Sequence, residues 1–267
     1  MKKLQDETGV VLSNWQTGAG LCIMTVLARE IASQIQPGQF VHMKIPGMEG
    51  HLLRRPFSVY AVDESSGAIE ILYQVVGFGT KHMTSLVPGD EVALIGACGN
   101  TWRENKQVKS ALLVAGGVGA APLFMLCENL LAEGASVHVV LGAQTKQALV
   151  CYERYKKLAE KFEGANLMVE AATDDGSFGH AGFCTDLVAH ALAEKSFDYV
   201  AVCGPEPMMR IVAKLALEAG VPCEISLEKR MACGIGACLS CVVETTEGRK
   251  RACIDGPVFD AEKVVFS

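Results

Sequence analysis

Four cysteines near the end of the chain are the residues whose type and spacing most clearly predict chemistry. They are Cys233, Cys238, Cys241 and Cys253, and they follow the pattern C-x4-C-x2-C-x11-C. Cysteine thiolates are soft ligands, so such a group binds zinc or iron when the fold brings the sulfur atoms together. The segment CGIGACLSC also contains two glycines, which let a loop bend closely around a ligand. The pattern predicts a metal or cluster site, unless the cysteines form disulfides.

The spacing favours an iron–sulfur cluster over the two other possibilities. A C-x4-C-x2-C segment followed by a more distant cysteine is typical of plant-type [2Fe–2S] sites. A structural zinc site usually pairs two C-x2-4-C knuckles, whereas Cys253 stands alone after the hairpin-like segment VVETTEGRKRA. Disulfides are the weakest alternative, because nothing in the sequence directs the chain to an oxidising compartment. We therefore expect all four cysteines to hold a cluster, with zinc as the second choice.

Composition predicts a folded protein of the cytoplasm. Half of the 267 residues are hydrophobic and 20% are charged, with a net charge of −6, which suits two or three domains. Lysine and arginine do not cluster, so we expect no nucleic-acid binding. The start, MKKLQDETGV, lacks the apolar stretch of a secretory signal, and no run approaches the ~18 apolar residues of a membrane span. The other cysteines are scattered and are expected to be small buried residues: Cys22, Cys98, Cys127, Cys151, Cys184, Cys203 and Cys223.

Two different patterns of secondary structure precede the cysteine segment. Over the first hundred residues, short apolar runs are separated by the turn segments ESSG, GFGT and VPGD, which predicts a small antiparallel β-barrel. Strands then alternate with helices, which predicts βαβ units and a parallel sheet covered on both faces. We expect a multi-domain chain with a barrel over residues 1–104, an α/β domain over 105–226 and a small ferredoxin-like cluster module over 227–267.

Two loops of the α/β part are candidates for binding a nucleotide. The turn VAGGVGAAP, with Gly116, Gly117 and Gly119, joins its first strand to its first helix. Glycines let a phosphate approach the backbone closely, and a helix N-terminus offers free N–H groups. A tight packing turn would use the same glycines. The second loop, CGPEPMM with Gly204 and Pro205, follows another buried strand, and loops at one sheet edge favour a nucleotide crevice.

The motifs RRPFS, GGVGAAP and CGPEPMM occur in this order, and together the chain resembles the ferredoxin–NADP reductase superfamily. The resemblance implies FAD on the barrel and a nicotinamide nucleotide on the α/β domain. Arg55 is then expected to pair with the FAD pyrophosphate, because guanidinium offers a planar donor fork to phosphate. Arg54 is expected at the surface or an interface. The implied FAD-binding residues are Arg55, Pro56, Phe57, Ser58, Leu72, Tyr73, Gln74, Gly79 and Thr80.

With the cysteine segment MACGIGACLSC and the ending RACIDGPVF, the whole chain resembles the electron-transfer subunits of NAD-dependent (type B) dihydroorotate dehydrogenases. The resemblance implies a separate FMN-containing catalytic subunit, a heterotetramer with two subunits of each kind, and transfer of electrons through [2Fe–2S] and FAD to NAD+ in pyrimidine synthesis. It also implies that Cys203 lies near the nicotinamide as a positioning contact.

Two other functions remain open from the sequence. The chain could be an NAD(P)H-linked reductase module that serves another oxidoreductase, because the partner is not in this sequence. A redox sensor would need a disabled flavin site, yet RRPFS and GFGT are both intact. The segment LGAQTKQAL offers only Lys146 near the expected ribose site, so the choice of NAD over NADP rests mainly on the resemblance.

Overall fold

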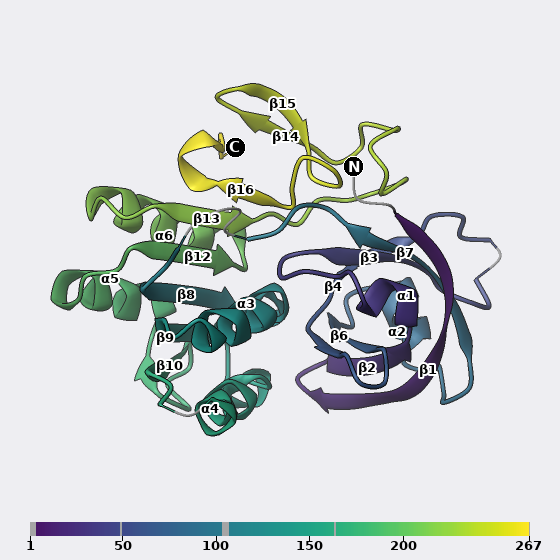
Figure 1. Cartoon of the computed structure of the whole chain (residues 1–267), viewed down its shortest axis with the longest axis horizontal. Helices are drawn as coiled ribbons and strands as arrows, with labels where there is room; N and C mark the ends of the chain where they lie inside the picture. Colours follow the sequence, from purple (N-terminus) through teal and green to yellow (C-terminus); the bar gives the residue numbers. More distant parts are fainter. Residues whose placement is uncertain (1–3, 49, 103–106, 163, 267) are drawn as a thin grey trace. The chain divides into compact units, whose positions relative to one another are not determined.

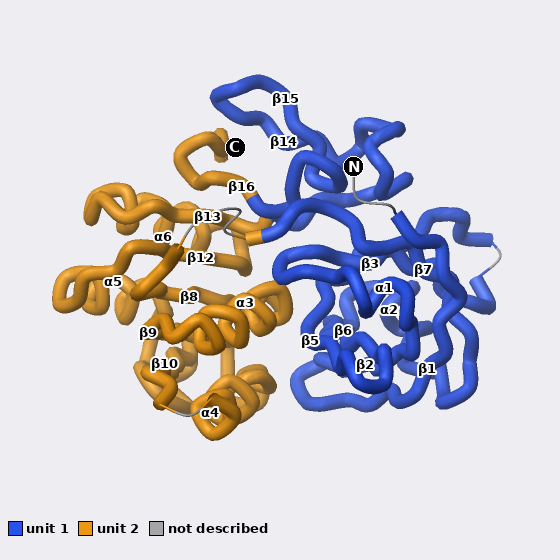
Figure 2. The backbone as a smooth tube through the Cα atoms, in the orientation of Figure 1, with its two compact units in different colours: residues 1–101, 227–258 blue, residues 102–226, 259–267 orange. Residues whose placement is uncertain are grey.

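The chain folds into two compact units, which Figure 2 shows in different colours. The computed structural model describes residues 4–48, 50–102, 107–162 and 164–266. Unit 1 comprises residues 1–101 and 227–258, and unit 2 comprises residues 102–226 and 259–267. The boundary expected between residues 104 and 105 lies outside the described residues. The cysteine segment therefore shares a compact unit with the first hundred residues.

Unit 1 is built on a seven-stranded sheet with the order β4-β3-β7-β1-β2-β6-β5, in which neighbouring strands are antiparallel (Figure 1). Its strands are β1 (Gln5–Gly18), β2 (Leu21–Leu27), β3 (Phe40–Lys44), β4 (Arg55–Ser58), β5 (Ala61–Asp63), β6 (Ala68–Gln74) and β7 (Glu91–Cys98). Two short helices, α1 (Arg29–Ala32) and α2 (Phe78–Met83), lie in the connections. The long strand β1 has irregular register after Val11 and after Gln16, and bulges of this kind bend a sheet. The expected antiparallel barrel is confirmed as a half-barrel.

Strand β3 differs from an ordinary half-exposed strand, because both of its faces are covered. Phe40, Val41, His42 and Met43 are all buried. Successive side chains of a strand point to opposite faces, so Val41 and Met43 share one face and His42 lies on the other. The face of His42 is covered by the cysteine segment, since a Cβ built on Gly234 would lie 2.4 Å from its ring. This strand therefore joins the half-barrel to the cysteines.

Unit 2 contains the parallel sheet that the alternating pattern predicts, and this expectation is confirmed. The strand order is β11-β10-β9-β8-β12-β13-β16, and the pairs from β11 to β13 are parallel. The strands are β8 (Ser110–Gly116), β9 (Ser136–Ala143), β10 (Leu167–Thr173), β11 (His180–Ala181), β12 (Tyr199–Cys203), β13 (Cys223–Ser226) and β16 (Val258–Asp260). The helices are α3 (Ala121–Ala132), α4 (Tyr152–Lys161), α5 (Cys184–Glu194) and α6 (Glu206–Glu218).

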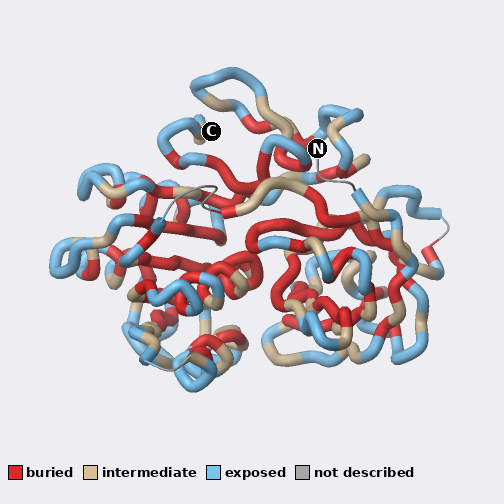
Figure 3. The backbone as a smooth tube through the Cα atoms, in the orientation of Figure 1, coloured by how far each residue is buried: buried red, intermediate tan, exposed pale blue. Residues whose placement is uncertain are grey.

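The centre of this sheet forms the core of unit 2. Strands β8 and β12 are buried almost throughout, as Figure 3 shows, because helices cover a parallel sheet. Leu112 and Leu113 on β8 are fully buried, and each such side chain contributes about 1.5–3 kcal/mol. Short 3-10 turns, η1 (Gly117–Ala120), η2 (Lys146–Ala148) and η3 (Ala261–Lys263), complete the connections. The described part of the chain contains no helix with the length and apolar character needed to cross a membrane.

The cysteine segment has little regular structure. A loop carries the first three cysteines, and a hairpin of β14 (Val242–Thr245) and β15 (Gly248–Arg251) precedes the fourth. Asn100, which follows β7, binds the segment after the fourth cysteine. Its backbone N–H donates to the Gly256 carbonyl over 2.6 Å, and its side chain exchanges two hydrogen bonds with the backbone of Val258. These bonds attach the end of the segment to the half-barrel within unit 1.

Candidate functional site

The two adjacent arginines of the RRPFS motif have different surroundings. Arg54 donates from Nη1 to the carbonyls of Ala93 (2.7 Å) and His42 (3.4 Å), and its Nη2 lies 3.8 Å from Asp6 Oδ1. It therefore holds strands of the half-barrel together and is not simply a surface residue. Arg55, at the start of β4, donates from Nη1 to the Leu53 carbonyl. Its Nε and Nη2 lie near Gly79 of helix α2, where they could bind a phosphate.

Helix α2 brings the GFGT motif next to Arg55. A Cβ built on Gly79 would lie 3.5 Å from Nε and 3.7 Å from Nη2 of Arg55, so the backbone of the motif lies directly beside the guanidinium. Thr80 accepts hydrogen bonds from the N–H groups of Val76 (3.0 Å) and Gly77 (3.2 Å), which fixes the start of the helix. Guanidinium and helix N–H donors on one side of a glycine fit the diphosphate of FAD.

Aromatic residues of the expected flavin site lie on two strands that face each other. The rings of Phe57 on β4 and Tyr73 on β6 meet edge to face, with centroids 6.2 Å apart. Tyr73 is buried, and its hydroxyl donates to Asn14 Oδ1 over 3.0 Å. Burial, together with Cys22, raises the pKa of Tyr73, so this hydroxyl stays protonated. Tyr73 therefore contributes to the fold through its hydroxyl.

The remaining expected FAD residues differ in exposure. Pro56 and Ser58 on β4 are half-buried, Leu72 is buried and Gln74 is exposed. A cavity of about 510 Å³ opens beside Tyr73 in unit 1. It is lined by Asn14, Trp15, Gln16, Gly20, Cys22, Tyr73, Val75 and Thr84. No sequence pattern predicts the cavity, because its lining comes from four separated segments.

In unit 2, the two candidate nucleotide loops touch each other at the carboxyl edge of the sheet. A Cβ built on Gly119 would lie 2.2 Å from the carbonyl oxygen of Cys203, and one on Gly204 would lie 2.9 Å from the backbone nitrogen of Gly116. Both loops therefore depend on glycine for their close approach. Gly117 has a positive φ of 56°, and no described atom lies within 4 Å of a Cβ built there. Such an open glycine turn before a helix fits a bound dinucleotide phosphate.

Side chains near these loops add detail that the sequence did not reveal. Met208 on α6 packs against both loops. A Cβ built on Gly116 would lie 2.9 Å from its Sδ, and a Cβ built on Gly204 would lie 2.6 Å from its Cε. Pro205 precedes α6, and a Cβ built on Gly116 would lie 2.7 Å from the Cδ of Pro205. Cys203 ends β12 and is 3% exposed, so its backbone is the part nearest to the crevice edge.

The four cysteines form two pairs. The N–H of Cys238 lies 3.4 Å from Cys233 Sγ, and the two thiols interact. Cys253 interacts mainly with Cys241 and also with Cys233. No three histidine, cysteine or acidic side chains gather round one point in the described residues. Two pairs of thiols fit a two-iron cluster, in which each iron takes two of the four cysteine ligands.

The surroundings of the thiols differ in a way that suits a cluster near the surface. Cys238 is exposed, and Ser240 Oγ lies 3.3 Å from its Sγ. The hydrogen bond from Ser240, and then the contact with Cys233, lower the pKa of Cys238 to about 6, so this thiol is ionised and ready to bind metal at neutral pH. Burial, followed by the neighbouring Cys241, raises the pKa of Cys253 to about 12. Cys253 would therefore release its proton to solvent only when a metal binds its sulfur.

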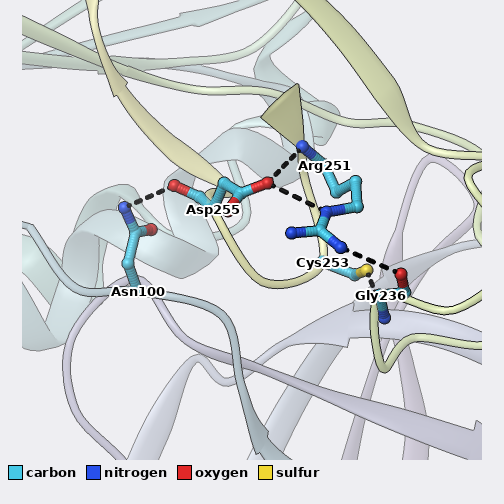
Figure 4. Close-up of polar contacts among 5 residues, drawn as sticks. All are labelled: Asn100, Gly236, Arg251, Cys253 and Asp255. Carbon is cyan, nitrogen blue, oxygen red and sulfur yellow. Dashed lines mark hydrogen bonds and ion pairs between the residues drawn. The ribbon is translucent and has the colours of Figure 1, made fainter. Parts of the chain in front are cut away.

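A network of polar contacts holds the cluster loop, as Figure 4 shows. The Gly236 N–H donates to Cys253 Sγ over 3.2 Å, and the Gly236 carbonyl accepts from Arg251 Nη1 over 3.2 Å. Arg251 also donates from Nε and from its backbone N–H to Asp255 Oδ2, over 3.1 and 2.7 Å. The Asp255 carbonyl accepts from Asn100 Nδ2 over 3.3 Å. The charged pair thus helps to fix Gly236, the residue whose N–H donates to the sulfur of Cys253.

Sequence reasoning missed four residues of this site: His42, Asn100, Arg251 and Asp255. Arg251 and Asp255 flank Cys253 in RACID, so their charge was a possible signal. His42 and Asn100 are far from the cysteines in sequence, and no local pattern marks them. The cysteines, Arg55 and the two glycine loops were predicted because each has a spacing tied to a known chemistry, and their roles stay predictions.

Comparison with known protein families gives three matches along the chain. The iron-sulfur cluster binding domain of dihydroorotate dehydrogenase B matches residues 228–265. The oxidoreductase FAD-binding domain matches residues 24–102, and the oxidoreductase NAD-binding domain matches residues 113–214. The chain therefore carries FAD-binding, NAD-binding and cluster-binding domains, and it is an oxidoreductase component.

A solved structure and a more distant one share the fold. The structure of an NADH-dependent reduced ferredoxin-NADP oxidoreductase, reported for its insights into flavin-based electron bifurcation, superposes with a TM-score of 0.85 at 29% identity. That match covers 96% of this chain and 89% of the other. The cytochrome b5 reductase domain of Ulva prolifera nitrate reductase, at 16% identity and a TM-score of 0.66, covers 81% of this chain and 93% of that chain and shares the fold alone.

Curated relatives extend over nearly the whole chain. The electron transfer subunit of dihydroorotate dehydrogenase B (NAD(+)) from Desulforamulus reducens is 36% identical over 260 residues, covering 96% of this chain and 97% of the relative. The subunit of the same name from Geobacillus kaustophilus is 40% identical over 248 residues, covering 91% and 92%. The chain belongs to the family of dihydroorotate dehydrogenase B (NAD(+)) electron transfer subunits.

Proposed function

We propose that this chain accepts electrons from a separate catalytic subunit that oxidises dihydroorotate to orotate, and passes them through a [2Fe–2S] cluster and FAD to NAD+. When bound, the cluster carries one electron at a time, the nicotinamide exchanges two as hydride, and flavin does both. The three proposed parts are a FAD-binding barrel over residues 1–104, a NAD-binding domain over 105–226 and a cluster module over 227–267.

The observation that carries this proposal is the arrangement of the cluster loop. Its cysteines lie in two pairs, and exposed apolar side chains stand beside them. Ile235 is 49% exposed, Leu239 is 61% exposed and Ile254 is 40% exposed. Apolar residues gathered round a redox site at the surface are typical of an interface with an electron-transfer partner. We propose that this surface binds the FMN-containing catalytic subunit, in a heterotetramer with two subunits of each kind.

The roles of individual residues follow from their positions. Arg55 and the start of α2 hold the FAD diphosphate, Phe57 contacts the flavin, and Ser58 hydrogen-bonds its ring. The loops of Gly116–Gly119 and Cys203–Pro205 hold the nicotinamide nucleotide, with Cys203 as a positioning contact. NAD is preferred because Lys146, which follows β9, lies with its Nζ 5.4 Å from the centre of the Phe178 ring instead of standing free for a 2′-phosphate. We expect the complex in the cytoplasm.

The test compares the chain alone with the reconstituted complex. Alone, it should hold two irons and two labile sulfides, reduce dyes with NADH, and fail to oxidise dihydroorotate, since none of its described features is a base poised for carbon-acid chemistry. Adding a catalytic subunit of dihydroorotate dehydrogenase B should create NAD+ reduction by dihydroorotate. Dihydroorotate oxidation by the chain alone at the rate of the complex would refute the proposal.

A matched pair of variants tests the partner surface. Leu239→Glu should abolish the coupled activity and the association, while the isolated subunit keeps its iron and its dye reduction. Leu217→Glu on α6, where the original leucine is 58% exposed, should bind the partner normally. If both variants assemble with wild-type affinity, the partner binds elsewhere.

One second candidate has a specific observation in its favour. The structure with a TM-score of 0.85 is described as an NADH-dependent reduced ferredoxin-NADP oxidoreductase. On that reading, this chain is an NAD(P)H-linked reductase module serving another oxidoreductase. Reduction of a ferredoxin by NADH, without any response to dihydroorotate and the catalytic subunit, would favour this candidate.

A further inference from the structure

His42 on β3 is a buried histidine whose ring has no clear use in the half-barrel. The residue is 0% exposed. Among the residues that the structure describes, neither Nδ1 nor Nε2 has a hydrogen bond of ordinary geometry. Buried polar groups are nearly always paired, because an unpaired one loses its contacts with water and gains nothing. A ring with two such atoms therefore indicates a function beyond packing.

The ring faces the cluster loop at its first cysteine. Gly234 has a φ of 70°, and a Cβ built there would lie 2.4 Å from His42 Nδ1, so only glycine allows this approach. The backbone of Cys233 and the backbone of Arg54 are the acceptors that the ring nitrogens face. His42 thus stands between the ligand Cys233 and the residue that precedes Arg55.

The strand pairing places His42 beside the expected flavin residues. His42 is directly opposite Pro56 in the β3–β4 ladder, and Arg55 and Phe57 flank Pro56. Paired residues share a face, whereas their neighbours point to the other. One strand pair therefore carries the cluster contact and Pro56 on one face, and Arg55 and Phe57 on the other.

The groups that face the ring limit what it can bind. They are the backbones of Cys233 and Arg54. An imidazole carries at least one N–H, so it can donate to the Cys233 backbone and hold it in place.

We propose that His42 is a positioning residue that connects the cluster loop to the flavin strand, holds the Cys233–Gly234 peptide in place, and tunes the potential of the cluster and its electron exchange with FAD. This inference rests on the proposed function only in taking Cys233 as a cluster ligand. Hydrogen bonds around a cluster and the orientation of its ligands set its potential. An N–H donor near a ligand stabilises the reduced, more negative form, so its removal lowers the potential.

The first experiment compares three variants in the full chain with FAD and the cluster bound. His42→Phe keeps a ring without an N–H, and His42→Gln restores a donor. His138→Phe is the control, because His138 in unit 2 is 4% exposed and its Nδ1 also has no partner among described atoms. The readouts are the midpoint potential and electron paramagnetic resonance spectrum of the reduced cluster, iron release to a chelator, and the rate of cluster reduction after NADH is added.

His42→Phe should lower the potential, alter the spectrum and speed iron release by about tenfold to a hundredfold. His42→Gln should recover part of each change, and His138→Phe should change none of them. A wild-type potential, spectrum and iron release in His42→Phe would show that the ring only fills space. If the wild-type chain holds no cluster, both this inference and the proposed function fail. If His42→Phe shifts the potential but no catalytic subunit binds, only the proposed function fails.

A second experiment tests the contact itself. Gly234→Ala should speed iron release, because its methyl group meets the imidazole. Gly248→Ala is the control for backbone strain, since Gly248 has a φ of 96° and no described atom lies within 4 Å of a Cβ built there. The double variant His42→Ala/Gly234→Ala should lose iron more slowly than the two single effects combined predict. If the increases in iron release of the two single variants simply add in the double variant, His42 and Gly234 are not in contact.

Discussion

Gly119 lies so close to Cys203 that a Cβ on Gly119 would be 2.2 Å from the Cys203 carbonyl oxygen. Cys203 ends β12, and Gly119 lies in the short turn η1 that follows the neighbouring strand β8. Strands β8 and β12 are paired from Tyr199 opposite Ala111 to Cys203 opposite Ala115. The strand pairing thus forces the two loops together, and glycine is what lets them meet. Any side chain at position 119 must push one loop away from the other.

We therefore expect Gly119→Ala to weaken NADH binding. Overpacking of this kind costs about 1–3 kcal/mol, and 1.4 kcal/mol is tenfold in affinity. Titration of NADH against the purified chain measures the effect. Gly134→Ala, which adds only backbone strain at a φ of 80° with no described atom within 4 Å of the new Cβ, should bind NADH normally. Equal affinity in both variants would mean that the loops do not form the nucleotide site.

Replacing each of the two arginines of RRPFS should affect a different property of the protein. Arg55→Ala should weaken FAD binding roughly tenfold to a hundredfold, because charge-assisted bonds of about 1.5–3 kcal/mol are lost. Arg54→Ala should retain FAD but lower the free energy of unfolding by about 1–3 kcal/mol, since the Ala93 carbonyl loses its donor. Flavin fluorescence after gel filtration and chemical denaturation measure the two effects. Loss of FAD from Arg54→Ala alone would reverse the assignment.

Arg251 should matter for the cluster although it binds no metal. Arg251→Ala removes the hydrogen-bond donor to the carbonyl of Gly236. The backbone N–H of the same residue, Gly236, donates to Cys253 Sγ. We expect iron release to a chelator to become about tenfold to a hundredfold faster. Arg249→Ala is the control, because Arg249 lies two residues away on the same hairpin with a side chain 77% exposed. An exposed pair of this kind contributes about 0–1 kcal/mol, so iron release should not change.

Unit 2 should lose stability as the pH falls below neutrality, in part because of His138. Burial lowers the pKa of His138 despite its 2.6 Å contact with Glu170 Oε2. In the unfolded chain, His138 has its ordinary pKa of about 6.5. It therefore binds a proton in the unfolded state at a pH where it is still neutral in the folded state. This contribution to stability is fully present above about pH 6.5. It is lost as the pH falls toward the lowered pKa, by at most about 1.4 kcal/mol per pH unit.

Fluorescence of Trp102, which is buried in unit 2, follows this unfolding in a Trp15→Phe background. His138→Gln should flatten the dependence of the unfolding free energy on pH. His190→Gln on α5, where the histidine side chain is 70% exposed, should leave the dependence as it is. An unchanged profile in His138→Gln would show that His138 is not the titrating group.

The sequence predicts local features of this protein well and distant pairings poorly. The half-barrel and the parallel sheet follow from strand periodicity and turn residues, and the cluster cysteines follow from their spacing. Tyr73 fits a flavin strand by motif, yet its hydroxyl bonds Asn14, which is 59 residues away. Asn100 bonds Asp255 and Val258, which are 155 and 158 residues away. No local pattern encodes such contacts, because the first arises only when β1 and β6 come together in the half-barrel, and the others only when the cysteine segment packs on it.

The bonds of Asn100 also constrain the order in which the chain can complete its structure. Most of unit 2 is one continuous stretch, residues 102–226, whereas unit 1 needs residues 227–258 in addition to residues 1–101. During synthesis from the N-terminus, a half-barrel that has already emerged must wait for its last segment until unit 2 has been made. His42 and Asn100 remain uncovered during that interval. Insertion of iron and sulfide must therefore follow the synthesis of unit 2, and a chain that carries its cluster is one in which residues 227–258 have already been made.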